Sequence, residues 1–249
     1  MNDTLFFSAP QLKRDPLGSA YNSRMDISPY DSSELLERTW HAREEGVFQR
    51  LFGNLGPGIY TLQPATFEPF GAKETDPRWL HCGVFESPPS RGRISWIYVS
   101  SGLSNPWWNS ATRRPGYSGL GCEFLLELTA RAPWGIAHVQ NIVAFQLLLT
   151  SGQYPDRPPL DSWDRVPLRQ PIDAHSSELS YLLVAPPDDP SRTFHLESGR
   201  VVVYTLVGVT EVEAGFARDQ GGERLLEKLK AGGAYPVTDP ERHSVISAA

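Results

Sequence analysis

The segment that most limits the fold of this chain is Trp96-Ile97-Tyr98-Val99-Ser100-Ser101-Gly102-Leu103-Ser104. A β-branched and aromatic run ends there in a turn of small residues, which is typical of a strand that leaves a sheet. After a glycine-rich break, residues 122–128 alternate apolar side chains with Glu123 and Glu127, and this alternation predicts a second strand. We expect the two strands to be neighbours in a sheet that has one buried face. Neither segment carries a set of residues that could do chemistry.

The remaining elements predict the fold class. Further strands are expected at residues 59–62, 79–85, 181–185 and 201–207, the last at the centre of the sheet. Helices are expected from Asp31 to Gly46, from Pro133 to Gly152, from the capping-box sequence that starts at Thr210, and over 223–229, with long loops at 104–119 and 152–178. Strands and helices do not alternate regularly, which favours an α+β fold. We predict a single α+β domain over residues 31–249, with a mixed, largely antiparallel β-sheet flanked by helices, preceded by an extended arm over residues 1–30.

Charge and composition exclude several classes of partner. The net charge of −6 and the dispersed basic residues argue against a nucleic-acid-binding surface. The N-terminus lacks the features of a signal peptide, and no apolar run reaches the ~18 residues that a membrane helix needs. We therefore expect a cytoplasmic protein without nucleic-acid or membrane partners. Cys82 and Cys122 lie in apolar stretches, which indicates small buried side chains in a reducing compartment; a disulfide between them is left open.

We predict no catalytic residue, no metal site and no cofactor. The chain has no phosphate-binding glycine loop, no nucleophile elbow and no pair of histidines or cysteines at metal-ligand spacing. Two alternatives to a binding protein remain open. One is an enzyme with a dispersed acidic or Cys/His site assembled only by the fold, such as Cys82 or Cys122 beside His138. The other is a structural scaffold that forms homo-oligomers.

The loop that follows the Gly-Leu-Ser turn carries the candidate binding residues. Trp107 and Trp108 are adjacent tryptophans in a polar, proline-containing loop. A loop tryptophan that stays exposed is typical of binding hot spots, although both could instead cover the open edge of the sheet as core residues. We take Trp107, Trp108, Arg113, Arg114 and Tyr117 as candidate partner-binding residues.

Several of these segments, in this order, resemble the suppressor of fused domain. They are Trp96–Ser104, Gly119–Phe124, Pro133-Trp134 with Val139–Val143, Val203–Glu213 and Val237–Arg242, and the resemblance covers roughly residues 35–246. It implies a single α+β domain with a mixed sheet flanked by helices. The animal member of the family regulates the Hedgehog pathway and carries a second domain. It holds a short peptide of a transcription factor as an added strand between the two domains.

The resemblance also implies a function. In the animal protein the loop after the Gly-Leu-Ser turn borders the peptide groove, and Trp107 matches an aromatic residue there, whereas Pro115 stands near the place of an acidic residue. The length of the chain resembles that of the short bacterial members, which are regarded as non-enzymatic and are suspected immunity proteins against toxins delivered between bacteria. We therefore expect a non-enzymatic bacterial domain that binds a protein or peptide partner, with a polymorphic toxin as one candidate. A cytosolic immunity or adaptor protein is the concrete form of this prediction.

Overall fold

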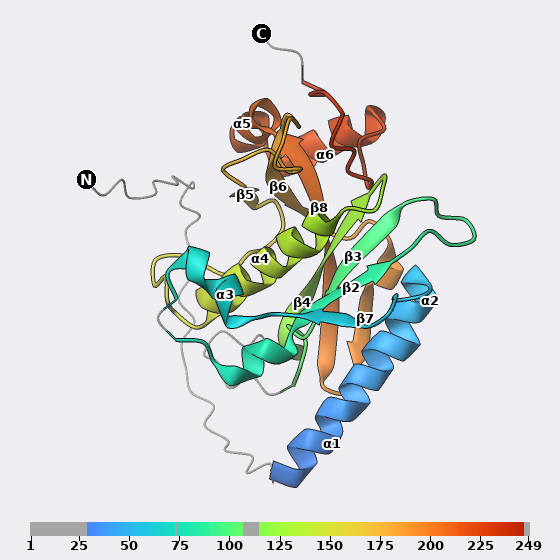
Figure 1. Cartoon of the computed structure of the whole chain (residues 1–249), viewed down its shortest axis with the longest axis vertical. Coiled ribbons are helices and arrows are strands. Elements are labelled where there is room, and N and C mark those ends of the chain that lie inside the picture. Colours follow the sequence, from blue (N-terminus) through green and yellow to red (C-terminus); the bar gives the residue numbers. More distant parts are fainter. Residues whose placement is uncertain (1–28, 73, 107–114, 247–249) are drawn as a thin grey trace.

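A mixed eight-stranded sheet forms the centre of the molecule (Figure 1). The computed structural model describes residues 29–72, 74–106 and 115–246. The strand order is β1-β2-β3-β4-β8-β6-β5, and β7 pairs with the first part of β8. Among the strands of the described residues, β4 and β8 run parallel and every other neighbouring pair is antiparallel. The strands are β1 (Ile59–Thr61), β2 (Gly83–Ser87), β3 (Trp96–Ser101), β4 (Tyr117–Leu128), β5 (Arg165–Pro167), β6 (Leu179–Ala185), β7 (Thr193–Leu196) and β8 (Gly199–Thr210).

Helices cover both faces of this sheet. They are α1 (Pro29–Trp40), the π-helix η1 (His41–Phe48), α2 (Gln49–Phe52), α3 (Pro64–Phe67), α4 (Pro133–Thr150), α5 (Glu211–Gln220) and α6 (Gly222–Ala231), with short 3₁₀ turns at Glu68–Phe70, Pro77–His81 and Pro190–Arg192. Helix α4 lies across one face, and Figure 1 shows it in front of the strands. No helix in the described ranges is long and apolar enough to cross a bilayer.

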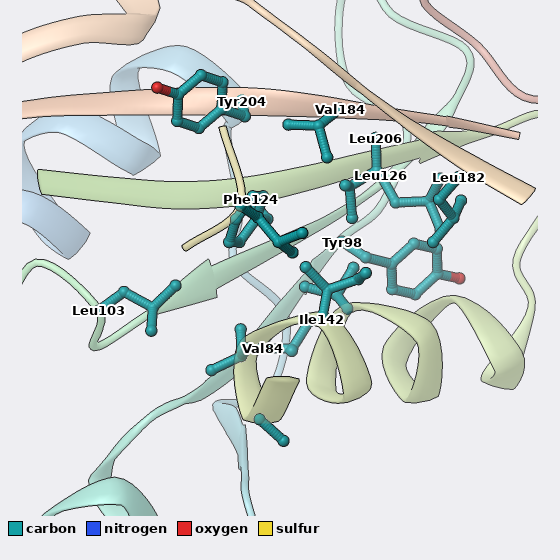
Figure 2. Close-up of a cluster of buried hydrophobic side chains, with 14 of the residues drawn as sticks. Val84, Tyr98, Leu103, Phe124, Leu126, Ile142, Leu182, Val184, Tyr204 and Leu206 are labelled. Atoms are coloured by element: carbon teal, nitrogen blue, oxygen red, sulfur yellow. The ribbon is translucent and has the colours of Figure 1, made fainter. Parts of the chain in front are cut away.

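The largest hydrophobic core lies between α4 and the sheet. Figure 2 shows Ile142 of α4 beside the strand residues Tyr98 and Leu126. Helix α4 is apolar around most of its circumference, so it can only be stable when buried in this way. Two smaller cores lie on the opposite face: η1 and α2 cover one, and α5 and α6 cover the other. The predicted α+β class and mixed sheet are thus confirmed.

The prediction that only one face of the sheet is buried is wrong. Glu123 is 0% exposed and Glu127 is 5% exposed, although both point to the face opposite α4. The helix α1–η1–α2 covers that face, since Val47, Phe48 and Phe52 pack there. The same packing explains why this helix continues past Gly46, where we expected it to end, as far as Phe52. Burial of the apolar side chains outweighs the ~1 kcal/mol that a glycine costs inside a helix.

Other boundaries also differ from the prediction. Residues 79–85 are not one strand, because Asp76 accepts a hydrogen bond from the Arg78 amide at 2.9 Å and starts a 3₁₀ turn at Pro77 that lasts to His81. Strand β4 begins at Tyr117, inside the predicted loop 104–119, and β5 lies inside the predicted loop 152–178. The capping box of Thr210 and Glu213 and the central position of β8 are confirmed.

Gly119 occupies a place that no other residue fits. Its φ is +54°, and a Cβ atom there would lie 2.3 Å from the backbone oxygen of Asn105. We expect Gly119→Ala to lower the free energy of unfolding by about 2–3 kcal/mol, because the clash is with backbone and cannot relax cheaply. Urea unfolding measures this loss. Gly116→Ala is the matched control, since φ is also positive there but nothing lies within 4 Å of the added Cβ; an equal loss for both variants would contradict the proposed clash.

Candidate functional site

The candidate binding loop leaves the sheet where β3 ends and returns where β4 begins. Trp107, Trp108, Arg113 and Arg114 lie outside the described residues. Tyr117 is described: it is half-buried at the start of β4, and the Arg200 guanidinium carbon lies 5.6 Å from the centre of its ring. At this position the Tyr117 ring and the neighbouring cation form part of the surface at the start of β4.

A buried carboxylate holds the turn from which the loop departs. Glu123 of β4 accepts hydrogen bonds from the backbone amides of Gly102 and Ser104, both at 3.0 Å. It also accepts from the hydroxyls of Ser104 at 2.7 Å and Ser100 at 2.5 Å. A buried carboxylate is costly unless it is saturated with donors, and these four donors saturate it. The turn therefore needs its small residues, because their backbone amides and hydroxyl groups donate the hydrogen bonds that Glu123 accepts.

A fully buried arginine of the helix η1 contacts this turn. Arg43 of η1 is 0% exposed and donates to the Ser104 hydroxyl and to the Asn105 side-chain oxygen, both at 2.9 Å. Its guanidinium also lies 3.1 Å from Glu44 and 3.9 Å from Glu123. The π-helical turn carries Arg43, and such turns are frequent at functional sites. We call Arg43, Ser104, Asn105 and Glu123 the loop-base cluster.

The loop-base cluster is not fully satisfied. Trp40 donates its indole N–H to the Asn105 oxygen at 3.0 Å, so that oxygen accepts from two side chains. The Asn105 side-chain nitrogen and Nε of Arg43 are buried and have no hydrogen-bond partner within the described residues. Each such group costs about 1–3 kcal/mol. The cluster therefore fixes the loop base, and its two unsatisfied groups lower the free energy of unfolding.

An acidic hollow lies next to the loop-base cluster. It has a volume of about 310 Å³ and is lined by Glu37, Trp40, His41, Glu44 and Glu45. Glu44 accepts from the Ser101 hydroxyl at 2.5 Å, and Glu45 lies 3.0 Å from His41. The turn between β7 and β8 is tied to the same end of the sheet, because Glu197 accepts two hydrogen bonds from Arg38 of α1, at 3.0 and 3.2 Å. The end of α1, the β7–β8 turn and the loop base thus lie together at this end of the sheet.

The surroundings of Cys82 and His138 do not favour a Cys/His catalytic site. Burial raises the pKa of the Cys82 thiol, which disfavours the reactive thiolate. The His138 ring nitrogen is 2.7 Å from the Ile172 carbonyl oxygen, and burial lowers the pKa of this histidine. Cys122 accepts a hydrogen bond from Gln146 at 3.7 Å. Both cysteines are buried and neither forms a disulfide, and no group of three His, Cys, Asp or Glu side chains in the described ranges could hold a metal ion.

The residues of the loop-base cluster were not among the predicted site residues. Arg43 lies in the segment His-Ala-Arg-Glu-Glu, which has the composition of a solvated helix face. Glu123 gave the better signal, because it interrupts an otherwise apolar strand directly after a Ser-Ser-Gly-Leu-Ser turn that supplies hydrogen-bond donors.

The sheet and its loop base define an α+β domain with a preformed surface at one end of the sheet. The sequence profile described as suppressor of fused protein matches residues 78–243. The chain belongs to the suppressor of fused family, as the resemblance predicted. The comparison with curated proteins gives no match.

Solved structures share the fold. A chain in the crystal structure of a Sufu–Fu complex is 23% identical, with a TM-score of 0.57, over 80% of this chain and 88% of that one. Drosophila Suppressor of Fused is 26% identical, with a TM-score of 0.52, over 66% of this chain and 42% of its own. A suppressor of fused homologue from Neisseria gonorrhoeae is 17% identical, with a TM-score of 0.57, over 88% of this chain and its whole length.

Proposed function

We propose that this protein is a non-enzymatic binding domain that occludes a protein partner. The Sufu–Fu complex supports a protein as the partner, since a relative of the same fold is crystallised with one. The observation that carries the proposal is the loop-base cluster: a fully buried arginine and a fully buried glutamate are used to fix the base of one surface loop. Fixing the residues from which a loop departs lowers the conformational entropy that is lost on association.

The role that we propose for the domain is that of a cytosolic bacterial immunity or adaptor protein. A polymorphic toxin is the candidate partner, and the loop residues Trp107, Trp108, Arg113 and Arg114, together with Tyr117, form the proposed contact. Aromatic and arginine side chains are the residue types that dominate binding energies in protein interfaces. The half-buried Tyr117 beneath Arg200 supports this assignment at the one position of the set that is described.

Replacing the loop tryptophans tests the proposal. We expect the double variant Trp107→Ala/Trp108→Ala to weaken binding of the partner that co-purifies from the native host by at least about 30-fold, the effect of losing one hot spot. Isothermal titration calorimetry with the purified partner measures the dissociation constant. Val212→Ala on α5 is the control, because Val212 is exposed and belongs to another part of the surface. An unchanged dissociation constant for the double variant would refute the proposed placement of the surface.

A further inference from the structure

The hairpin between β2 and β3 carries the most exposed large apolar side chain of the described residues. Ile94 is 92% exposed, and the next such residue, Val212, is 50% exposed. In Figure 1 the hairpin projects from the body of the molecule near the end of α2. It lies at the start of β3, whereas the binding loop follows the end of that strand. An isolated exposed isoleucine on a surface needs no explanation by itself, so the argument depends on how this one is held.

The tip of the hairpin is closed by backbone hydrogen bonds. Ser90 and Arg93 exchange both of theirs: the Ser90 amide donates to Arg93 at 2.9 Å, and the Arg93 amide donates to Ser90 at 3.0 Å. Arg91 and Gly92 form the two-residue turn, and Gly92 supplies the positive φ of +91° that such turns favour. Ile94 therefore follows a closed turn.

The side chain of Arg93 fixes the hairpin to the body of the protein. Its guanidinium donates to the carbonyl oxygens of Phe52 and Pro88, both at 2.8 Å, and to the Ser87 hydroxyl at 2.9 Å. It also donates to the Ser95 carbonyl oxygen. The Ser87 hydroxyl in turn donates to Phe52 at 2.7 Å, which ties the hairpin to the end of α2. The residues on both sides of Ile94 are thus held in place while its own side chain remains in water.

The charge next to Ile94 is positive. Arg91 is exposed at the tip and has no ion pair within the described residues, although the chain as a whole carries −6. Two positions after Ile94, Trp96 is partly exposed with the Arg131 guanidinium carbon 5.5 Å from its ring centre. Glu86 orients Arg131 through two hydrogen bonds of 3.0 and 2.9 Å. Arginine and tryptophan are enriched among hot-spot residues.

We propose that this hairpin is a second contact surface, on which Ile94 enters an apolar pocket of an acidic protein partner and Arg91 pairs with a carboxylate at the rim of that pocket. The inference rests on the proposed protein-binding function and adds a contact separate from the loop. A preformed hairpin loses little conformational entropy on docking, which favours a role for Ile94 as an anchor. An unpaired arginine beside the anchor selects a partner of opposite charge.

Crosslinking followed by titration tests this surface on the full chain. A photoreactive p-benzoylphenylalanine is placed at position 94 in cells of the native host, and at position 212 in the control. We expect position 94, and not position 212, to crosslink one protein. The purified partner should then bind Ile94→Asp at least about tenfold more weakly than the wild type, and bind Val212→Asp as the wild type does. Arg91→Glu should weaken binding as well, with a larger effect at low salt.

Two results would overturn the inference: no crosslink from position 94 above the control, or an unchanged dissociation constant for Ile94→Asp. If Trp107→Ala/Trp108→Ala still weakens binding of the partner that co-purifies from the native host, the proposed function stands and only the hairpin contact fails. Thermal unfolding of both aspartate variants should match the wild type, because both side chains face solvent.

Discussion

Arg43→Met should lower the free energy of unfolding by about 3–5 kcal/mol, because it leaves the buried Glu123 carboxylate without a compensating charge. It also removes the donors to the Ser104 hydroxyl and the Asn105 oxygen. Methionine keeps most of the volume of the arginine stem, so the loss reports on the charge and the hydrogen bonds more than on packing. Urea denaturation followed by tryptophan fluorescence measures the change.

Two further variants make the test specific. Arg50→Met, on the exposed side of α2, should change the free energy of unfolding by less than about 0.5 kcal/mol. In the double variant Arg43→Met/Glu123→Gln the second change should cost less than it does alone, by about 0.5–3 kcal/mol, because the uncompensated charge is gone. Strictly additive losses would show that Arg43 and Glu123 do not interact.

Glu213→Gln should remove a pH-dependent part of the stability. The Glu213 carboxylate accepts two hydrogen bonds from Arg242, at 2.8 and 2.7 Å, and one from each of the Val245 and Thr210 amides, at 2.8 Å. Burial alone would raise the pKa of Glu213, but the hydrogen bonds from Arg242, Val245 and Thr210 outweigh it and hold the pKa below its ordinary value. Breaking a buried pair of this kind costs about 2–4 kcal/mol at pH 7.

The sign of the pH effect follows from the lowered pKa. The unfolded chain takes up a proton on Glu213 near its ordinary pKa of about 4.3, while the folded protein resists protonation until a lower pH. The stabilisation is therefore present in full above about pH 4.3 and is lost as the pH falls through the pKa of the folded state. Urea unfolding at pH 7, 5, 4 and 3 measures the effect. The difference in free energy of unfolding between wild type and Glu213→Gln should become smaller as the pH falls below about 4.3. Glu223→Gln, on the exposed side of α6, is the control, and parallel profiles for wild type and Glu213→Gln would contradict the assignment.

Much of the fold followed from local pattern. The β-branched run of β3, the apolar β8, the proline-initiated α4 and the Thr210 capping box each have one dominant local signal, and each is found where predicted. The failure at Gly46 has a tertiary cause, because burial of the following apolar residues overrode the local stop signal. Gly46 remains helical because Phe48 and Phe52 pack onto the face of the sheet opposite α4. No residue near Gly46 in the sequence indicates that this face is covered.

The site was only partly predictable for a similar reason. The position of the loop after β3 follows from the Ser-Ser-Gly-Leu-Ser turn, and its aromatic and basic residues are visible in the sequence. The pairing of Arg43 with Glu123 joins residues eighty positions apart, and in sequence each is an ordinary charged residue. Only the packing of η1 against β4 shows that both are buried.

The parallel pairing of β4 with β8 has a consequence for the synthesis of the protein. Cys122 lies opposite Val202, so the central pair joins segments that leave the ribosome eighty residues apart. The antiparallel strands β1 to β4 can associate as soon as they emerge, but one edge of β4 must wait for β8. Until then that edge presents unpaired amides and carbonyls to any other extended chain. The nascent protein is therefore most exposed to mispairing during this interval, and a chaperone would matter most then.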